Sequence, residues 1–147
     1  MITDKLLRVS EDQVVTLTDT SAVSTDKIDL GTARDIGEGK ELLMNFAITT
    51  AVAGGTSTQF EVITASDAAL SSNVVVLGST GAVATASLTL GTNLAVPFRP
   101  LIGSKGQRYI GARYTVVGTN SAGKVTADVV ETVQDGKKFY ASGFTVA

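Results

Sequence analysis

Apolar and polar residues alternate in short runs along this chain, and glycine or Asn/Asp/Ser clusters interrupt these runs every 8–12 residues or so. In the segment 57–64, Phe60 and Val62 fall on one side of an extended chain, whereas Gln59 and Glu61 fall on the other. Helical periodicity is nearly absent, and β-branched Val, Ile and Thr are abundant. The pattern therefore predicts short β-strands. We expect them at 13–18, 25–30, 41–49, 57–64, 74–77, 84–90, 93–98, 107–117 and 124–133.

Some segments carry more specific signals. The continuous apolar run 74–77 predicts a strand that is covered on both faces, and the glycines of 78–81 predict a turn after it. Pro97 and Pro100 bracket Phe98 and Arg99 and cannot donate backbone hydrogen bonds, so we expect strand 93–98 to end at the edge of a sheet or to leave the sheet. Segment 66–72 could form one helical turn, capped by Ser66 or Asp67.

Eight or nine short strands in one domain favour an all-β fold, a double-sheet jelly-roll-like sandwich, with a closed barrel as the main alternative. The 147 residues fit a single domain, 1–147, without an internal repeat or a long linker. Residues 1–12 are expected as an N-terminal arm and 134–147 as a C-terminal tail. The tail is rich in apolar residues, so we expect it to dock either on its own sheet as a last strand or on a neighbouring subunit as an arm.

Charged residues make up 18% of the chain, fewer than the roughly 25% of an average soluble protein. Mean hydropathy is +0.26, and the excess lies in Val, Ala, Thr and Gly rather than in large side chains. Two interpretations stay open: a β-rich fold with a Thr/Ser surface, or a surface that other chains partly cover.

Composition also excludes several kinds of chemistry. The chain has no cysteine and no histidine, which removes thiolate or imidazole metal sites, disulfides and histidine-based nucleophilic catalysis. Net charge is -2 with no basic block, so nucleic acid is not an expected partner. No apolar run approaches the roughly 20 residues that span a membrane. We therefore expect no enzyme activity, no metal and no cofactor.

The remaining candidates for chemistry are weak. Asp26 and Asp29 would point to opposite faces of a strand, and Asp35 and Glu38 lie between glycines in a polar loop. Neither pair offers the contrast of apolar and polar surroundings that acid/base catalysis needs. The glycine-rich segments 37–39 and 103–106 resemble phosphate loops, but no helix start follows either of them.

Three stretches, taken in order, resemble one known family. The first comprises Met-Ile-Thr-Asp-Lys-Leu-Leu from Met1, Ser-Thr-Asp-Lys-Ile-Asp-Leu-Gly from Ser24 and Ala-Arg-Asp-Ile-Gly-Glu-Gly from Ala33. The second is Pro-Leu-Ile-Gly-Ser-Lys-Gly-Gln-Arg-Tyr-Ile-Gly-Ala-Arg-Tyr from Pro100, and the third is Gln-Asp-Gly-Lys-Lys-Phe-Tyr-Ala-Ser-Gly-Phe-Thr-Val from Gln134. Together they resemble the jelly-roll capsid cement (decoration) proteins of tailed bacteriophages; residues 50–95 match in pattern only.

The resemblance implies a structural role rather than catalysis. It implies a jelly roll on the outer surface of an HK97-like capsid, where the protein clamps neighbouring major capsid subunits. The expected partners are the major capsid protein and the chain itself, with a homodimer favoured over a trimer. The expected location is the virion surface, after synthesis in the cytoplasm of the bacterial host.

Contact residues are expected in two glycine-rich loops and the tail. Arg side chains are enriched at interfaces because they bind carboxylates and backbone carbonyls. The expected capsid or subunit contacts are Arg34, Asp35, Glu38, Arg99, Lys105, Arg108, Lys137, Lys138, Phe139, Tyr140 and Phe144. The alternative is a jelly-roll module that binds carbohydrate or a host surface, although only 5% of residues are aromatic and Trp is absent. A β-scaffold hydrolase would need a catalytic pair that the sequence does not provide.

Overall fold

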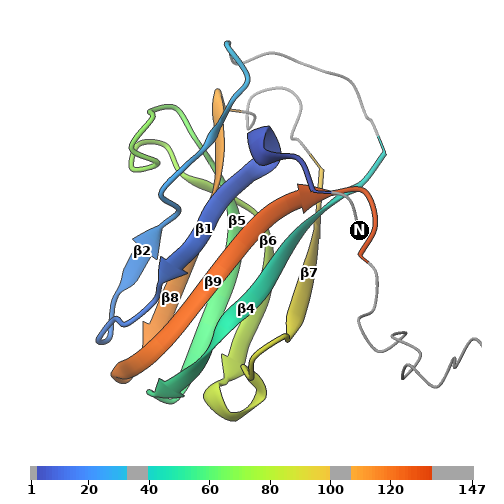
Figure 1. The fold of residues 1–147 in the computed structure, drawn as a ribbon. Helices are drawn as coiled ribbons and strands as arrows, with labels where there is room; N and C mark the ends of the chain where they lie inside the picture. Colours follow the sequence, from blue (N-terminus) through green and yellow to red (C-terminus); the bar gives the residue numbers. More distant parts are fainter. Residues whose placement is uncertain (1–2, 33–39, 100–106, 134–147) are drawn as a thin grey trace, which may run out of the picture.

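Two antiparallel sheets pack face to face in the computed structural model of the chain, which describes residues 3–32, 40–99 and 107–133 (Figure 1). In chain order the elements are η1 Lys5–Leu7, β1 Arg8–Val14, β2 Ser21–Val23, β3 Ile28–Asp29, β4 Leu42–Gly54, β5 Ser57–Ala65, β6 Val75–Ala84, η2 Thr85–Ser87, β7 Asn93–Phe98, β8 Tyr109–Val117 and β9 Asn120–Val130. The η elements are single 3₁₀ turns. The expected all-β sandwich is confirmed.

The strand order is that of a jelly roll. One sheet runs β1-β9-β4-β7 and the other runs β2-β8-β5-β6, with β3 also paired to β8. Early and late strands of the chain pair with each other: β1 with β9, β2 and β3 with β8, β4 with β7, and β5 with β6. These pairs form when one long antiparallel ribbon folds over on itself to make the two sheets.

Every second residue of the strands points into the space between the two sheets and helps to fill it. Phe46 of β4, Phe60 of β5 and Tyr114 of β8 are fully buried, and their ring centroids lie 5.3–6.0 Å apart. Each such side chain contributes roughly 1.5–3 kcal/mol when it leaves water. The Tyr114 hydroxyl lies 2.7 Å from the Ser10 hydroxyl, so its polar end is satisfied within the core.

A second, smaller apolar cluster lies on the outer face of the β5–β8 sheet. Ile63 and Ala65 of β5 point away from the main core and are covered by Leu70 from the connection between β5 and β6. The Asp67 carboxylate holds this connection in shape by accepting hydrogen bonds from the backbone N–H groups of Ser71 and Ser72. The segment forms turns rather than the expected helical turn.

The prediction for the segment around β6 was wrong in three respects. The apolar run 74–77 opens an edge strand, β6, in which Val76 is 43% exposed, rather than a strand covered on both faces. The expected turn at 78–81 lies inside β6, and the expected strand at 84–90 is mostly η2 and loop. The glycines suggested a turn, but a side chain at Gly78 would lie 2.6 Å from the Pro97 carbonyl oxygen, so glycine is needed there for close packing of β6 on β7.

The N-terminal region also differs from the expectation. Part of the expected arm is strand β1, Arg8–Val14, which pairs with β9 and adds Val9 to the core. The short strand β2 follows β1 and pairs with β8. The tail, 134–147, lies outside the described residues. No helix in the described part of the chain is long and apolar enough to cross a membrane.

Candidate contact surface

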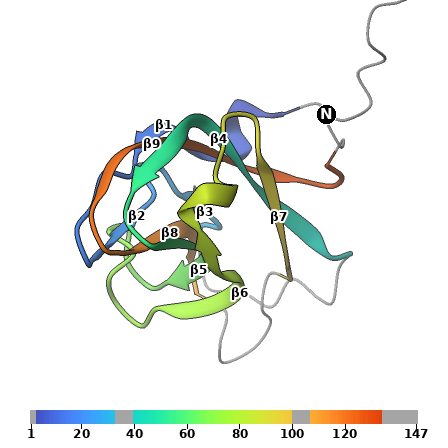
Figure 2. The same cartoon turned by 90° about the horizontal axis from the view of Figure 1, so that it is seen from below.

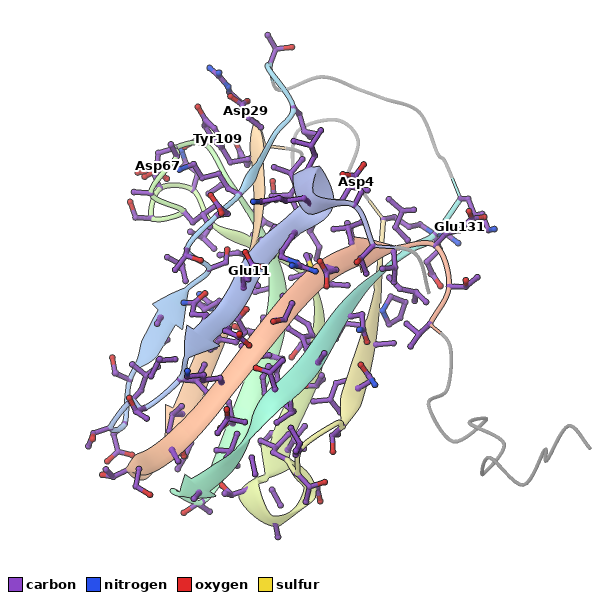
Figure 3. All side chains as sticks on the ribbon, in the orientation of Figure 1. Asp4, Glu11, Asp29, Asp67, Tyr109 and Glu131 are labelled. Atoms are coloured by element: carbon purple, nitrogen blue, oxygen red, sulfur yellow. The ribbon has the colours of Figure 1, made fainter. Side chains whose placement is uncertain are left out.

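Charged side chains gather at one end of the sandwich, where β4 and β8 begin and where β3, β7 and β9 end. The register fixes this arrangement, because Leu42 at the start of β4 lies opposite Phe98 at the end of β7 and Leu43 lies opposite Val130 of β9. In the other sheet Asp29 lies opposite Tyr109. We call this region the charged end, defined by Asp29, Lys40, Glu41, Arg99, Arg108 and Glu131. Figure 3 labels Asp29 and Glu131 on its two sides.

The pair Asp29–Arg108 has the best geometry at this end. Arg108 donates from Nε to Asp29 Oδ1 over 2.7 Å and from the guanidinium amino group to Oδ2 over 2.8 Å, a bidentate arrangement. Together with a hydrogen bond from the Gly31 N–H, Arg108 lowers the pKa of Asp29 to about 2. The guanidinium carbon also lies 5.0 Å from the Tyr109 ring centroid. Both charged groups remain more than 40% exposed and therefore accessible to a partner.

Two further ion pairs lie on the side of the β4–β9 sheet. Lys40 pairs with Glu131, and the lysine lowers the pKa of this carboxylate by hydrogen bonding and by its charge. Arg99 lies 3.8 Å from Glu41 in a looser contact. Exposed pairs of this kind stabilise a fold only weakly. Their groups can therefore exchange an internal partner for an external one at little cost.

The expected contact residues fall into two groups. Arg99 and Arg108 lie at the charged end, where each has an acidic partner. The others lie outside the described residues: Arg34, Asp35, Glu38, Lys105, Lys137, Lys138, Phe139, Tyr140 and Phe144. The described residues next to these segments, Lys40, Arg99 and Glu131 among them, belong to the charged end. Described residues that flank the three segments singled out from the sequence thus lie at one end of the fold (Figure 1).

Sequence reasoning missed two ion pairs on the outer sheet faces. Arg113 of β8 donates to the Glu61 carboxylate of β5 over 2.6 Å, and Arg8 of β1 donates to the Asp128 carboxylate of β9 over 2.8 Å. Glu61 and Asp128 are nearly buried. In the sequence, the only indication of these ion pairs was that Glu61 and Asp128 occur in strands whose polar and apolar residues alternate. Their arginine partners lie far away in the sequence, and the contacts can be recognised only once the strand register is known.

The described residues offer little for other kinds of site. None of them forms a group of three or more acidic side chains that could hold a metal ion. Four of their aromatic side chains belong to the core or pack into it, namely Phe46, Phe60, Phe98 and Tyr114. The ring of Tyr109 is half-buried and lies beneath Arg108. This part of the chain therefore has no open aromatic platform on which a sugar ring could stack.

A comparison with known protein families supports the assignment of the whole fold to one family. The family model described as Bbp16 matches residues 9–129, which include every strand from β2 to β8 and nearly all of β1 and β9. No curated protein matches the chain. The chain belongs to the Bbp16 family.

Proposed function

We propose that this protein is a non-enzymatic capsid cement protein of a tailed bacteriophage. In this role it binds the outer surface of an HK97-like capsid and clamps neighbouring major capsid subunits. The charged end is the surface that faces the shell. The protein is then part of the virion and requires no cofactor.

One observation carries the proposal: stretches that resemble cement proteins meet in space at the charged end. The stretch from Ser24 contains β3, and the stretch from Pro100 contains the start of β8. These two strands pair, with Ile28 opposite Ile110, and Asp29 and Arg108 close the pairing with a bidentate ion pair. The resemblance therefore coincides with an exposed, charged structural unit rather than with core positions alone.

The physical requirements of a cement protein fit such a surface. A protein that binds only the assembled lattice stabilises that lattice by the binding free energy of every copy. Many copies act together, so each contact can be modest. Exposed ion pairs suit modest and specific contacts, because electrostatic complementarity selects partner and orientation more than it adds affinity.

The test compares purified phage particles that contain this chain with particles of a deletion mutant. We expect the protein to co-purify with capsids, and capsids that lack it to lose resistance to heat or pressure. Adding the purified protein back should restore that resistance. If capsids without the protein withstand the same challenge unchanged, the cement function is wrong.

A charge reversal tests which surface faces the shell. Arg108→Glu removes the partner of Asp29 and places two carboxylates together at the charged end, so we expect it to weaken binding to deletion-mutant capsids. Lys124→Glu is the matched control, because Lys124 is an exposed cation near the start of β9, at the opposite end. Equal binding by the two variants would contradict the assignment of the charged end.

A further inference from the structure

Two leucines are exposed on the 3₁₀ turn η1, directly before strand β1. Leu6 is 84% exposed and Leu7 is 38% exposed. Among the exposed large apolar side chains in the described part of the chain, Leu6 has the largest exposed fraction, and only these two are neighbours in sequence. No residue of η1 is buried, so packing of the core does not account for the two leucines.

Hydrogen bonds hold the shape of η1. The Asp4 carboxylate accepts from the Leu6 N–H over 2.9 Å, and the Asp4 carbonyl oxygen accepts from the Leu7 N–H over 3.0 Å. Directly after the turn, the Arg8 side chain donates to the nearly buried Asp128 carboxylate. A side chain on such a preorganised turn loses less conformational freedom on binding than one on a free chain end.

The turn lies at the charged end. Arg8, which follows η1, lies opposite Asp128 of β9, and β9 ends two residues later. Figure 3 labels Asp4 at this end, between Asp29 and Glu131. Figure 2 looks at the molecule from the opposite end, so that η1 lies on the far side. The exposed leucines and the exposed ion pairs therefore share one end of the sandwich.

We propose that η1 is the apolar anchor of the charged end and that Leu6 enters an apolar recess on the major capsid protein. The anchor rests on the proposed function, since it adds affinity to the contact between the charged end and the shell. Protein interfaces have an apolar centre that excludes water and a polar rim that water reaches. The ion pairs supply such a rim, and Leu6 supplies the apolar side chain.

The charges beside η1 favour a protein partner over a membrane. Anionic lipids attract clusters of basic side chains. Here the cations are paired with acidic groups, Arg8 with Glu11 and Lys40 with Glu131. A surface with both signs of charge matches the complementary charges of another protein, which select the orientation of binding. Burial of Leu6 then supplies affinity that does not depend on charge.

Binding of full-length variants to deletion-mutant capsids tests the anchor. We expect Leu6→Ser to raise the dissociation constant by about tenfold, because serine offers no apolar surface to the recess. Leu6→Met keeps the volume and apolar character and should bind like the unmodified chain. Leu90→Ser is the matched control: Leu90 is 70% exposed and lies in the loop before β7, whereas the charged end contains the end of β7. Thermal unfolding checks that each variant folds.

Failure of the anchor and failure of the cement function give different results. If the unmodified chain does not bind these capsids, both are wrong. If it binds, and Leu6→Ser binds as well as Leu90→Ser, only the anchor is wrong. Binding to vesicles of phosphatidylcholine and phosphatidylglycerol that depends on Leu6, without such dependence on capsids, would also overturn the anchor in favour of a membrane contact.

Two substitutions of Asp4 test the role of the preorganised turn while Leu6 stays in place. Asp4→Ala removes the acceptor of the Leu6 N–H, whereas Asp4→Asn keeps an acceptor oxygen and removes only the charge. We expect Asp4→Ala to raise the dissociation constant severalfold and Asp4→Asn to leave it nearly unchanged. Equal binding by the two variants would contradict an anchor that depends on the shape of η1.

Discussion

Asp128 shows how strongly one partner can determine the cost of a buried charge. Its side chain is 4% exposed, and Arg8 Nε donates to its carboxylate over 2.8 Å. We expect Arg8→Met to lower the free energy of unfolding by about 3–5 kcal/mol, because the carboxylate is left buried without its cation. Urea unfolding of the full chain measures this difference.

The matched control is Lys40→Met. Lys40 pairs with Glu131, but both side chains are mostly exposed, so water replaces the lost partner. We expect this variant to unfold at nearly the same urea concentration as the unmodified chain. Equal losses in the two variants would show that burial of Asp128 does not govern the cost.

Asp29 gives a pH-dependent prediction. Its folded pKa is about 2, below the ordinary value, mainly because of the hydrogen bonds from Arg108. A lowered pKa means that the carboxylate stabilises the fold above its ordinary pKa of about 3.9 and loses this contribution as the pH falls toward 2. We expect Arg108→Gln to raise the pKa of Asp29 toward the ordinary value, as measured by NMR titration.

Asp67 is an internal control for that titration. Its pKa is also about 2, but the hydrogen bonds that lower it come from Ser71 and Ser72 and not from an arginine. It should titrate identically in the unmodified chain and in Arg108→Gln. An Asp29 pKa that stays near 2 in the variant would contradict a dominant role for the ion pair.

At the scale of elements, the connection between β5 and β6 depends on a glycine in β8. A methyl group at Gly111 would overlap the Leu70 side chain and lie 2.8 Å from Ser24 Oγ. We expect Gly111→Ala to destabilise the protein by about 1–3 kcal/mol, because Leu70 must leave its place over Ile63 and Ala65. Urea unfolding again gives the measurement.

A double variant separates this cause from a general effect on β8. Leu70→Ala alone should destabilise the protein through lost packing, by about 2–5 kcal/mol. In the double variant the added methyl group no longer overlaps the Leu70 side chain and keeps only its close approach to Ser24 Oγ, so the two single losses should sum to more than the measured effect. Strict additivity would show that Gly111 and Leu70 do not interact.

The same element scale shows what sequence pattern could and could not predict. Strands β5 and β8 match predicted runs closely, because each has one face in the core and therefore alternates clearly. Strand β6 does not match its prediction, because it lies at the edge of its sheet. Its glycines do not form a turn: Gly78 allows close packing against Pro97, and Gly81 adopts a backbone φ of +68°. A local pattern cannot report which neighbour a glycine must approach.

At the scale of the whole molecule, the structure locates the charge deficit that composition reveals. Six charged residues that form three ion pairs lie at the charged end, whereas the flank formed by 75–98 has none. Sequence alone could identify the loop arginines Arg99 and Arg108 as candidates. It could not bring Asp29 to Arg108, because that contact requires the pairing of β3 with β8 across a long sequence separation.

The C-terminal tail gives the last prediction at this scale. The nine strands in the described part of the chain end by Val130, before the tail begins. We expect deletion of residues 137–147 to leave a folded domain with an unchanged urea midpoint that no longer binds capsids, as an arm would require. A full-length variant with Phe139, Tyr140 and Phe144 replaced by Ser is the matched control for chain length and should lose the same binding.

If the shortened chain instead unfolds, the tail belongs to the core and its apolar side chains stabilise the domain itself. Circular dichroism decides between the two outcomes before any capsid is added.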